Sequence, residues 1–488
     1  MIETILISAG LLLLIGVLTS KISDRFGIPA LLLFLILGML AGSEGPGGIQ
    51  FDDPGIAQAA GVLALSLILF SGGVSTDWKS ARPVAKVSWP LATIGVFLTA
   101  VLLGLFASAL LGLPWRDGLL LGSIVSSTDA AAVFAILRSK GVNLKGNLKP
   151  LLELESGSND PMAMLLTIGM LRLLTQPDLP LTSLLSLFLQ QMGLGAIMGY
   201  LMGRLMVFLV NKLNLGYEGL YPVLTLALAI LLYGATAIIG GSGFLALYVA
   251  GIVLGNSECV HKKSLTRFHD GVGWLMQVAM FTTLGLFVFP SRLIPIAGSG
   301  LLISLWLMFV ARPVAVLGML APSKMPWREK ILIAWVGLRG AAPIILATFP
   351  FLYGIPEADL IFHLVFFIVA TSVLLQGTSI PLVAKWLGLA APLRRQRVYP
   401  IEFTPSNGLK GELTELQVFP NSPAVGRAIF QLGLPDDFLV ILLARGDDFL
   451  IPYGGLPLQA GDVLLVLSGP DSLQQVQGKW QLALLPAS

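Results

Sequence analysis

Long apolar segments follow one another along most of this chain, and they constrain its fold more than any other feature. Of its 488 residues, 55% are hydrophobic and only 12% are charged, whereas soluble domains carry about 25% charged residues. A membrane-spanning helix needs about 20 mostly apolar residues. Thirteen segments approach this length, at 2–20, 28–42, 55–75, 86–112, 117–138, 148–175, 182–212, 219–239, 242–256, 270–289, 294–321, 329–350 and 358–388. We therefore predict an all-α polytopic membrane protein with about 13 transmembrane helices.

Basic residues occupy alternate loops between these segments, which predicts the orientation of the chain. The loops rich in basic residues contain Lys21, Arg25, Lys79, Arg82, Lys86, Arg138, Lys140, Lys145, Lys149, Lys212, Lys262, Lys263, Arg267, Lys324, Arg328, Lys330, Arg394, Arg395 and Arg397. The opposite loops hold only Arg116 and Arg292, beside several acidic residues. Because basic loops stay in the cytoplasm, we expect the N-terminus outside and the C-terminus inside, in the cell inner membrane.

The composition changes after Leu393 and indicates a second domain. Alternating apolar and polar residues in "ELTELQVF", "FLVILLARGDDFLIP" and "DVLLVLSG" are typical of short strands, with a hairpin at "RGDD". We predict a transmembrane domain at 1–390, a linker at 391–411 and a small cytoplasmic α+β domain at 412–488. A domain of this size is marginally stable alone, so a dimer partner would stabilise it.

Carboxylates interrupt the apolar segment 151–171, "LLELESGSNDPMAMLLTIGML", which contains Glu153, Glu155 and Asp160. Asp160 lies near the middle of the predicted helix, where a charge costs roughly 2.5–3.5 kcal/mol on insertion scales. Ionisable groups at such depth usually mark ion or proton pathways, although a packing role satisfied by local hydroxyls is the alternative. Glu153 lies nearer the cytoplasmic end, and we interpret it as a structural or interfacial carboxylate.

Two further segments carry a central charge and residues that break helices. The first is "GSIVSSTDAAAVF", where the run from Ser126 to Asp129 favours an N-cap and a new helix from Ala130. The second is "WVGLRGAAPIILA", where glycine and proline surround Arg339. A buried arginine needs an acidic partner, and Glu155 is the first candidate and Asp129 the second.

These two segments are the fifth and the twelfth of the thirteen, so they cross the membrane in opposite directions. Paired interrupted helices in two inverted halves are typical of a transporter with its binding site at the midplane. The alternative for each is an ordinary kinked helix, and for Arg339 a role that only holds helices together.

Three motifs, "STDAAAV", "ESGSNDP" and "GLRGA", in this order over residues 1–390, resemble the NhaP-type cation:proton antiporters of the sodium/proton exchanger superfamily. The resemblance implies two inverted six-helix repeats with crossed broken helices, a homodimer and a moving core. It implies that the following residues bind the monovalent cation or the proton: Asp160, Asn159, Ser156, Asp129 and Thr128. It also implies that Glu155 and Arg339 form a structural ion pair, and that an asparagine at 159 accompanies electroneutral exchange.

One position departs from this pattern. Family members often carry a glutamate where "LFSGGVSTDW" has Ser71, so one carboxylate near the ion is missing. This departure leaves the choice between potassium and sodium open.

The C-terminal segment, with "SPAVGRAI" and "LQAGD", resembles the TrkA C-terminal domain, also called the C-terminal domain of regulators of potassium conductance. The resemblance implies dimeric cytoplasmic gating and is typical of potassium/proton antiporters. No glycine-rich nucleotide fingerprint precedes it, so the ligand of this domain is left open.

We expect a secondary active cation/proton antiporter, not an enzyme, without a cofactor or nucleic-acid partner. His261, His269 and His363 are scattered, and no histidine–cysteine cluster or phosphate-binding loop occurs. A gated cation channel or ligand-sensing membrane protein is the alternative, but a channel needs repeated filter segments. An anion or organic-solute symporter would favour basic side chains instead.

Overall fold

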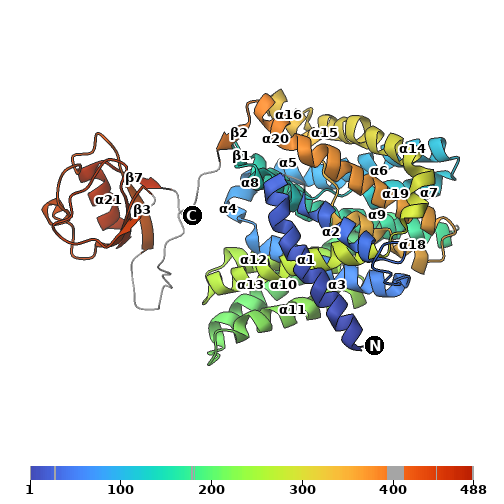
Figure 1. Cartoon of the computed structure of the whole chain (residues 1–488), viewed down its shortest axis with the longest axis horizontal. Coiled ribbons are helices and arrows are strands. Elements are labelled where there is room, and N and C mark those ends of the chain that lie inside the picture. Colours follow the sequence, from blue (N-terminus) through green and yellow to red (C-terminus); the bar gives the residue numbers. More distant parts are fainter. Residues whose placement is uncertain are drawn as a thin grey trace. The chain divides into compact units, whose positions relative to one another are not determined.

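The computed structural model describes residues 2–26, 29–176, 178, 180, 182–392, 412–446 and 448–485. Contacts divide the chain into two compact units, Met1–Leu393 and Arg394–Ser488. The first unit is built almost entirely of helices, and the second is a small sheet with one helix (Figure 1).

Short connections join the successive helices of the first unit. They are α1 (Ile2–Phe26), α2 (Ala30–Ala41), α3 (Pro54–Ser75), α4 (Trp78–Ala81), α5 (Ala85–Pro90), α6 (Val96–Leu111), α7 (Trp115–Val125), α8 (Ala130–Ser139), α9 (Leu148–Thr175), α10 (Thr182–Lys212), α11 (Leu220–Ile238), α12 (Gly243–Asn256), α13 (Lys262–Leu286), α14 (Pro290–Trp306), α15 (Arg312–Leu320), α16 (Trp327–Trp335), α17 (Ala341–Leu346), α18 (Phe349–Leu352), α19 (Ala358–Ser372) and α20 (Thr378–Trp386). Short π-helical turns join α5 to α6, α14 to α15, and α19 to α20. A two-stranded ribbon pairs β1 (Val142–Leu144) with β2 (Ala390–Pro392).

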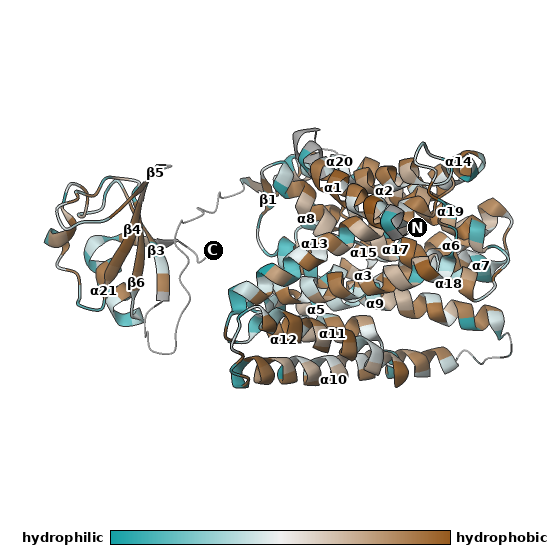
Figure 2. Ribbon diagram, turned by 60° about the horizontal axis from the view of Figure 1, so that its bottom comes forward, coloured by the Kyte–Doolittle hydropathy of each residue, from teal (hydrophilic) through white to brown (hydrophobic). Residues whose placement is uncertain are grey.

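Six helices of the described residues are long and apolar enough to cross a membrane, and the bent pair α7 and α8 would be a seventh span. Others, such as α2 and α12, are apolar but shorter. The predicted number of thirteen spans therefore stays a prediction. Figure 2 shows hydrophobic residues along α10 and α11, and large apolar side chains such as Leu189, Leu201 and Phe208 are exposed on α10. Such a surface belongs in lipid.

The helical unit consists of two groups of helices that pack more closely within each group than between groups. We call α1–α3 with α10–α13 the first bundle, and α5–α9 with α14–α20 the second bundle. Figure 1 shows the green helices α10–α13 together and the yellow and orange helices α14–α16, α19 and α20 together on the other side. Glycines permit the closest approaches inside a bundle: Gly73 of α3 meets Gly251 of α12, each leaving no room for a Cβ on the other.

Both predicted interruptions are present, and both lie in the second bundle. The α7 helix ends at Val125 and α8 begins at Ala130, at an angle of 45° to it. The α16 helix ends at Trp335 and α17 begins at Ala341. The first break therefore ends at the residue that the hydroxyl-rich run predicts.

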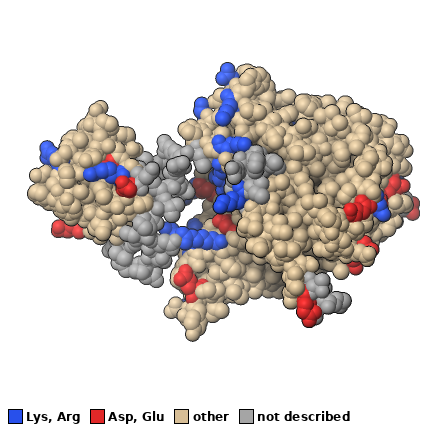
Figure 3. Space-filling view, viewed as in Figure 1, with Lys and Arg blue, Asp and Glu red and all other residues tan. Residues whose placement is uncertain are grey.

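The two ends of the helical unit differ in charge. Figure 3 shows Lys and Arg gathered along one end, whereas the opposite end carries mainly acidic residues. Near the acidic end, the Glu44 side chain accepts hydrogen bonds from the hydroxyl and the backbone N–H of Ser291. These bonds hold the pKa of Glu44 below its usual value.

The second unit is a five-stranded antiparallel sheet covered by one helix. Its elements are β3 (Glu412–Val418), β4 (Leu439–Arg445), β5 (Asp448–Leu450), β6 (Val463–Ser468), α21 (Pro470–Trp480) and β7 (Leu482–Leu485), with strand order β5-β4-β6-β3-β7. The predicted hairpin is present, since Arg445 of β4 pairs with Asp448 of β5. The buried Asp462 carboxylate binds the Arg445 guanidinium through two hydrogen bonds of 2.9 and 2.8 Å, which raises the pKa of Arg445.

Candidate functional site

The break between α7 and α8 is held by two side chains from α9. The Ser156 hydroxyl donates to the Thr128 carbonyl at 2.8 Å and accepts from the Ala130 N–H at 3.0 Å. The Asn159 amide donates to the Thr128 hydroxyl at 2.6 Å and accepts from the Thr128 N–H at 3.3 Å. Backbone groups freed by the break are thus satisfied from α9, as buried polar groups must be.

Asp129 sits where the two interrupted segments cross. Its side chain caps α8 by accepting from the Ala132 N–H at 2.9 Å, and its own N–H donates to the Leu338 carbonyl at 2.8 Å. Gly340 lies so close to the Asp129 carboxylate that a Cβ at position 340 would overlap with it. The crossing therefore requires glycine at position 340, which is the second glycine of the motif "GLRGA".

Arg339 is fully buried and reaches from the second break to the first. Its Nη1 donates to the carbonyls of Val125 and Ser127, both at 2.7 Å. These are carbonyls that no longer have a helical partner after α7 ends. The guanidinium therefore acts as a C-terminal cap for α7, where a positive charge is favourable.

The prediction that Glu155 pairs with Arg339 is wrong, because the structure pairs Glu155 with a different arginine. Glu155 instead contacts Arg312 of α15, with 2.6 Å between Oε1 and Nη2, and both side chains are only 1% exposed. Arg339 is committed to backbone carbonyls, although the charges of Glu155 and Arg312 both act on it. The only sequence signal for Arg312 is a single arginine in the apolar run 294–321, and it was not among the predicted site residues.

Two more side chains, also absent from the predicted site, hold the second break. The Arg339 N–H donates to the Ser372 hydroxyl at 3.1 Å, and this hydroxyl donates to Gln376 at 2.6 Å. The Gln376 amide then donates to the Trp335 carbonyl at 3.0 Å, at the end of α16. The sequence signal for Ser372 and Gln376 is weak, because single serine and glutamine residues in an apolar helix are common packing residues.

Asp160 lies one turn after Ser156 on α9 and is partly accessible. Its carboxylate is next to the Ser127 hydroxyl and within electrostatic range of Asp129. The Ser127 hydroxyl is buried and has no hydrogen-bond partner among the residues that the structure describes. The structure thus brings Asp160, Asp129 and Ser127 together, while Ser156, Asn159 and Thr128 form the adjacent hydrogen-bond network.

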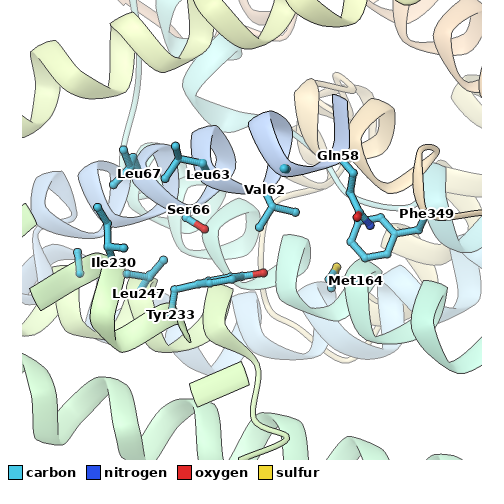
Figure 4. Close-up of a pocket in the computed structure, with 12 residues that line it drawn as sticks. Gln58, Val62, Leu63, Ser66, Leu67, Met164, Ile230, Tyr233, Leu247 and Phe349 are labelled. Carbon is cyan, nitrogen blue, oxygen red and sulfur yellow. The ribbon is translucent and has the colours of Figure 1, made fainter. Parts of the chain in front are cut away.

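A cavity of about 460 Å³ between the two bundles lies beside the Asp160 face of α9 (Figure 4). Its lining includes Met164, one helical turn after Asp160, with Phe349 from the second bundle and Val62, Ser66 and Tyr233 from the first. In Figure 4 these side chains converge from both bundles on the cavity. The cavity therefore reaches α9 at Met164, one helical turn from Asp160.

Tyr248 of α12 fills the space between the two bundles on the other side of Asp160 from Met164. Its ring packs directly on Gly157, where a Cβ would overlap with the ring. Its hydroxyl lies 3.5 Å from both the Thr76 hydroxyl and the Glu153 carbonyl. The two bundles therefore meet through Tyr248 on this side.

Ser71, the position that departs from the antiporter pattern, faces α13. Its hydroxyl donates to Asp270 at 3.4 Å, and the Ser75 hydroxyl donates to the same oxygen at 2.9 Å. A carboxylate is thus present beside position 71, but it comes from another helix.

Comparisons with known proteins agree with this architecture. Residues 10–386 match the family described as sodium/hydrogen exchanger, transmembrane, and residues 413–479 match the TrkA-C domain. The chain is 42% identical to the K(+)/H(+) antiporter NhaP of Alkalimonas amylolytica, over 94% of this chain and 80% of that protein. It is 40% identical to the K(+)/H(+) antiporter NhaP2 of Shewanella sp. (strain ANA-3), over 99% of this chain and 84% of that protein.

A solved structure shows the same similarity. The sodium proton antiporter MjNhaP1 from Methanocaldococcus jannaschii superposes with a TM-score of 0.69 and 26% sequence identity, covering 79% of this chain and 99% of that one.

Proposed function

The chain belongs to the sodium/hydrogen exchanger family, a family of secondary transporters and not of enzymes, and we propose that it exchanges potassium for protons at Asp160. Potassium is the cation named for the relatives that share 42% and 40% of its residues. The proposal for the site rests on one observation. In the described part of the chain neither buried arginine near the site pairs with Asp160: Arg312 pairs with Glu155, and Arg339 Nη1 donates to two backbone carbonyls. Asp160 therefore keeps its charge for a proton or a cation.

Competition for one carboxylate explains the exchange. Asp129 is used as the cap of α8, and Asn159 has no charge to offer. Asp160 then binds either one proton or one monovalent cation, with the Ser127 hydroxyl and the Asp129 carboxylate as further oxygen ligands. Each crossing carries the same charge, so the exchange is electroneutral. The same site does not support a channel, because its polar groups converge on one carboxylate and do not form repeated filter rings.

Movement of one bundle against the other would provide alternating access. A cavity lies between the two bundles beside Met164. On the other side of Asp160, Tyr248 packs on Gly157 and closes the space between the bundles. Sliding the second bundle along the first would open the Tyr248 side and close the cavity. The bundles pack more closely within themselves than against each other, and the contact between them consists mainly of buried apolar side chains.

We place the protein in the cytoplasmic membrane with the N-terminus outside and the C-terminus inside. The basic end of the helical unit supports this orientation, since basic loops remain in the cytoplasm. We further propose a homodimer, as the family resemblance implies, and regulation of exchange by the TrkA-C domain.

Asp160→Ala and Asp160→Asn test the loading site. Proteoliposomes that contain either variant should show no proton movement when a potassium gradient is applied, because neither side chain can ionise. Both proteins should still insert, since removal of a carboxylate makes the helix easier to bury. Glu153→Gln is the matched control: it removes a carboxylate two turns away on the same helix, one that pairs with Lys149, and should retain exchange. Near-normal exchange by well-inserted Asp160→Ala would move the loading role to Asp129.

Deletion of residues 412–488 tests the regulatory role. The truncated protein should insert and exchange cations with an altered activation by pH, because the deleted part is a separate compact unit. Rates and pH dependence equal to those of the full chain would contradict regulation by this domain.

A further inference from the structure

A second cavity, of about 370 Å³, lies on the other side of α9 from the cavity beside Met164. It is enclosed by α10 of the first bundle and by α6, α7 and α9 of the second, and its volume is typical of ligand pockets. Among the described residues that line it, only Ser123 carries a polar side chain, and its hydroxyl already donates to the Leu119 carbonyl. A ligand in this cavity must therefore be apolar where it contacts the helices.

The cavity opens on the apolar surface of the helical unit. Phe97 of α6 and Leu185 of α10 line it, and both side chains are also exposed. Both residues belong to helical segments that are long and apolar enough to cross a membrane. Hydrocarbon chains of lipid surround such segments at this depth, so the cavity is accessible to hydrocarbon.

The extent of the cavity along α9 matches the depth of one leaflet. Its lining runs from Met162 to Met170, which is about 12 Å along the helix, and half of the hydrocarbon core is about 15 Å. The α9 helix ends soon afterwards at Thr175, and α10 begins at Thr182, just before the lining residue Leu184. The cavity thus runs inward from the end of the helical unit that lies opposite the basic loops, which we call the outer end.

Arg116 of α7 lies across the outer end of the cavity. It precedes the lining residues Leu119 and Ser123 by three and seven positions, so it shares their face of the helix. Its Nη1 donates to the Leu173 carbonyl of α9 at 3.3 Å, just beyond the last lining residue of α9, Met170. The guanidinium therefore bridges α7 and α9 where the apolar lining ends.

This arginine is available to bind an anion. Among the described residues Arg116 forms no ion pair, and the Leu173 carbonyl occupies only one of the five N–H donors of a guanidinium. The exposed Arg172, in the last turn of α9, adds a second positive charge at this end. The Arg116 guanidinium also lies 5.4 Å from the ring of the exposed Trp115, and tryptophan is typical of the headgroup level of a membrane.

The position of this charge is unusual for a membrane protein. Arg116 is one of only two basic residues in the loops at the outer end, and the other, Arg292, pairs with Asp359. A basic residue on this side runs against the usual distribution. An apolar cavity that ends at a guanidinium matches a phospholipid, which has hydrocarbon chains below a phosphate, and arginine binds phosphate through two parallel hydrogen bonds.

We propose that this cavity binds one acyl chain of a membrane phospholipid whose phosphate binds Arg116. With the orientation proposed above, the lipid belongs to the outer leaflet. The chain fills the space between α10 of the first bundle and α6, α7 and α9 of the second. This inference does not depend on exchange at Asp160.

Photo-crosslinking of the wild-type protein locates the acyl chain. The full chain is reconstituted into vesicles of phosphatidylethanolamine and phosphatidylglycerol that contain a trace of phosphatidylglycerol with a diazirine in one acyl chain. After irradiation, the lining segments 162–170 and 184–188 should carry more adducts than 197–208, a part of α10 that exposes Ile197, Leu201 and Phe208 outside the cavity. Equal labelling of the two parts of α10 would indicate surrounding lipid only and would overturn the proposal.

Filling the cavity tests the same site by binding. Val101 is half-buried and lines the cavity, so the indole of Val101→Trp occupies the volume of the chain. Ile94→Trp is the matched control, since Ile94 is exposed seven positions earlier and lies outside the lining. In delipidated protein in detergent, added phosphatidylglycerol should raise the thermal unfolding midpoint of the wild type and Ile94→Trp in a saturable way, but not that of Val101→Trp. An equal rise in Val101→Trp would contradict the site, and the crosslinking ratio of the wild type decides the matter if this variant does not fold.

The phosphate contact has its own test. Arg116→Gln should weaken the binding of phosphatidylglycerol by about ten-fold in the same assay, because a hydrogen bond to a charged group is lost. Arg292→Gln removes a positive charge from the same end, but from a pair with Asp359, and should leave the affinity unchanged. Diacylglycerol with the same chains, which lacks the phosphate, should bind the wild type as weakly as phosphatidylglycerol binds Arg116→Gln. Equal affinities of the wild type and Arg116→Gln for phosphatidylglycerol would overturn the role of Arg116.

Discussion

The two interrupted helices differ in how their free backbone groups are satisfied. The break between α7 and α8 is held by side chains from α9 and by Arg339, which comes from the other break. The break between α16 and α17 is held by two neutral side chains, Ser372 and Gln376, and by the Asp129 N–H, which donates to the Leu338 carbonyl. The first break thus contributes the Asp129 carboxylate to the centre of the helical unit. The second break contributes the Arg339 guanidinium, which binds backbone carbonyls of the first break.

With the exchange that we propose at Asp160, this difference explains how a transporter can keep two arginines near its cation site without blocking it. An arginine beside a carboxylate normally forms a strong charge-assisted pair. Here Arg339 is held by the carbonyls of Val125 and Ser127, and Arg312 is held by Glu155. In the proposed mechanism Asp160 is thus left to bind a cation or a proton. The arrangement of the breaks therefore determines which carboxylate is available.

The largest expected effect concerns the ion pair that joins the helices next to both breaks. Removing one partner of a buried pair typically costs about 3–5 kcal/mol, because the other charge stays buried without its partner. Glu155→Gln and Arg312→Gln should each lower the free energy of unfolding by this amount, and the double variant by much less than the sum. The measurement is unfolding by SDS in mixed micelles.

The same cycle with Arg339 provides the control. Glu155→Gln and Arg339→Gln should be coupled more weakly than Glu155→Gln and Arg312→Gln, since Arg339 binds backbone carbonyls and interacts with Glu155 only through its charge. Strong coupling of Glu155 to Arg339, with none to Arg312, would restore the ion pair predicted from the sequence and contradict the structure.

An intermediate effect is expected at the glycines of the second break. Gly340→Ala places a methyl group against the Asp129 carboxylate where the two breaks cross, whereas a Cβ at position 337 would lie 3.2 Å from Arg312 Cγ, which is a smaller overlap. Forcing extra atoms into a packed core typically costs about 1–3 kcal/mol. Gly340→Ala should therefore lower both the unfolding midpoint and the exchange rate, and Gly337→Ala should affect them less. Equal effects would mean that the crossing is not tightly packed at Asp129.

The sequence predicted the general architecture of this site because each break leaves a local signal. Hydroxyls followed by aspartate predicted the N-cap at Asp129, and glycine and proline around Arg339 predicted the second interruption. The match to known antiporters confirmed the family that the three motifs indicate.

The partners across helices could not be predicted in the same way. An apolar helix gives no sign of which neighbour faces a given residue, so Arg312, Ser372 and Gln376 were missed as contacts of the site. The sequence analysis paired Glu155 with Arg339 and not with Arg312, because only a charge in an interrupted segment is accompanied by a recognisable local sequence pattern. Arg312 lies in a continuous helical segment, next to a π-helical turn, which carries no comparable pattern in the sequence.

The smallest expected effect compares the two serines that hold the breaks. Ser156 bonds to two backbone groups of the first break, the Thr128 carbonyl and the Ala130 N–H, whereas Ser372 accepts from one backbone group of the second, the Arg339 N–H. A typical hydrogen bond contributes about 1 kcal/mol net. Ser372→Ala should therefore lower the free energy of unfolding by about 1 kcal/mol, and Ser156→Ala by about twice as much. Unfolding by SDS in mixed micelles measures both. A larger loss in Ser372→Ala would show that the neutral break depends more on its side-chain support than the break that Arg339 caps, because Gln376 would then lose its position at the Trp335 carbonyl as well.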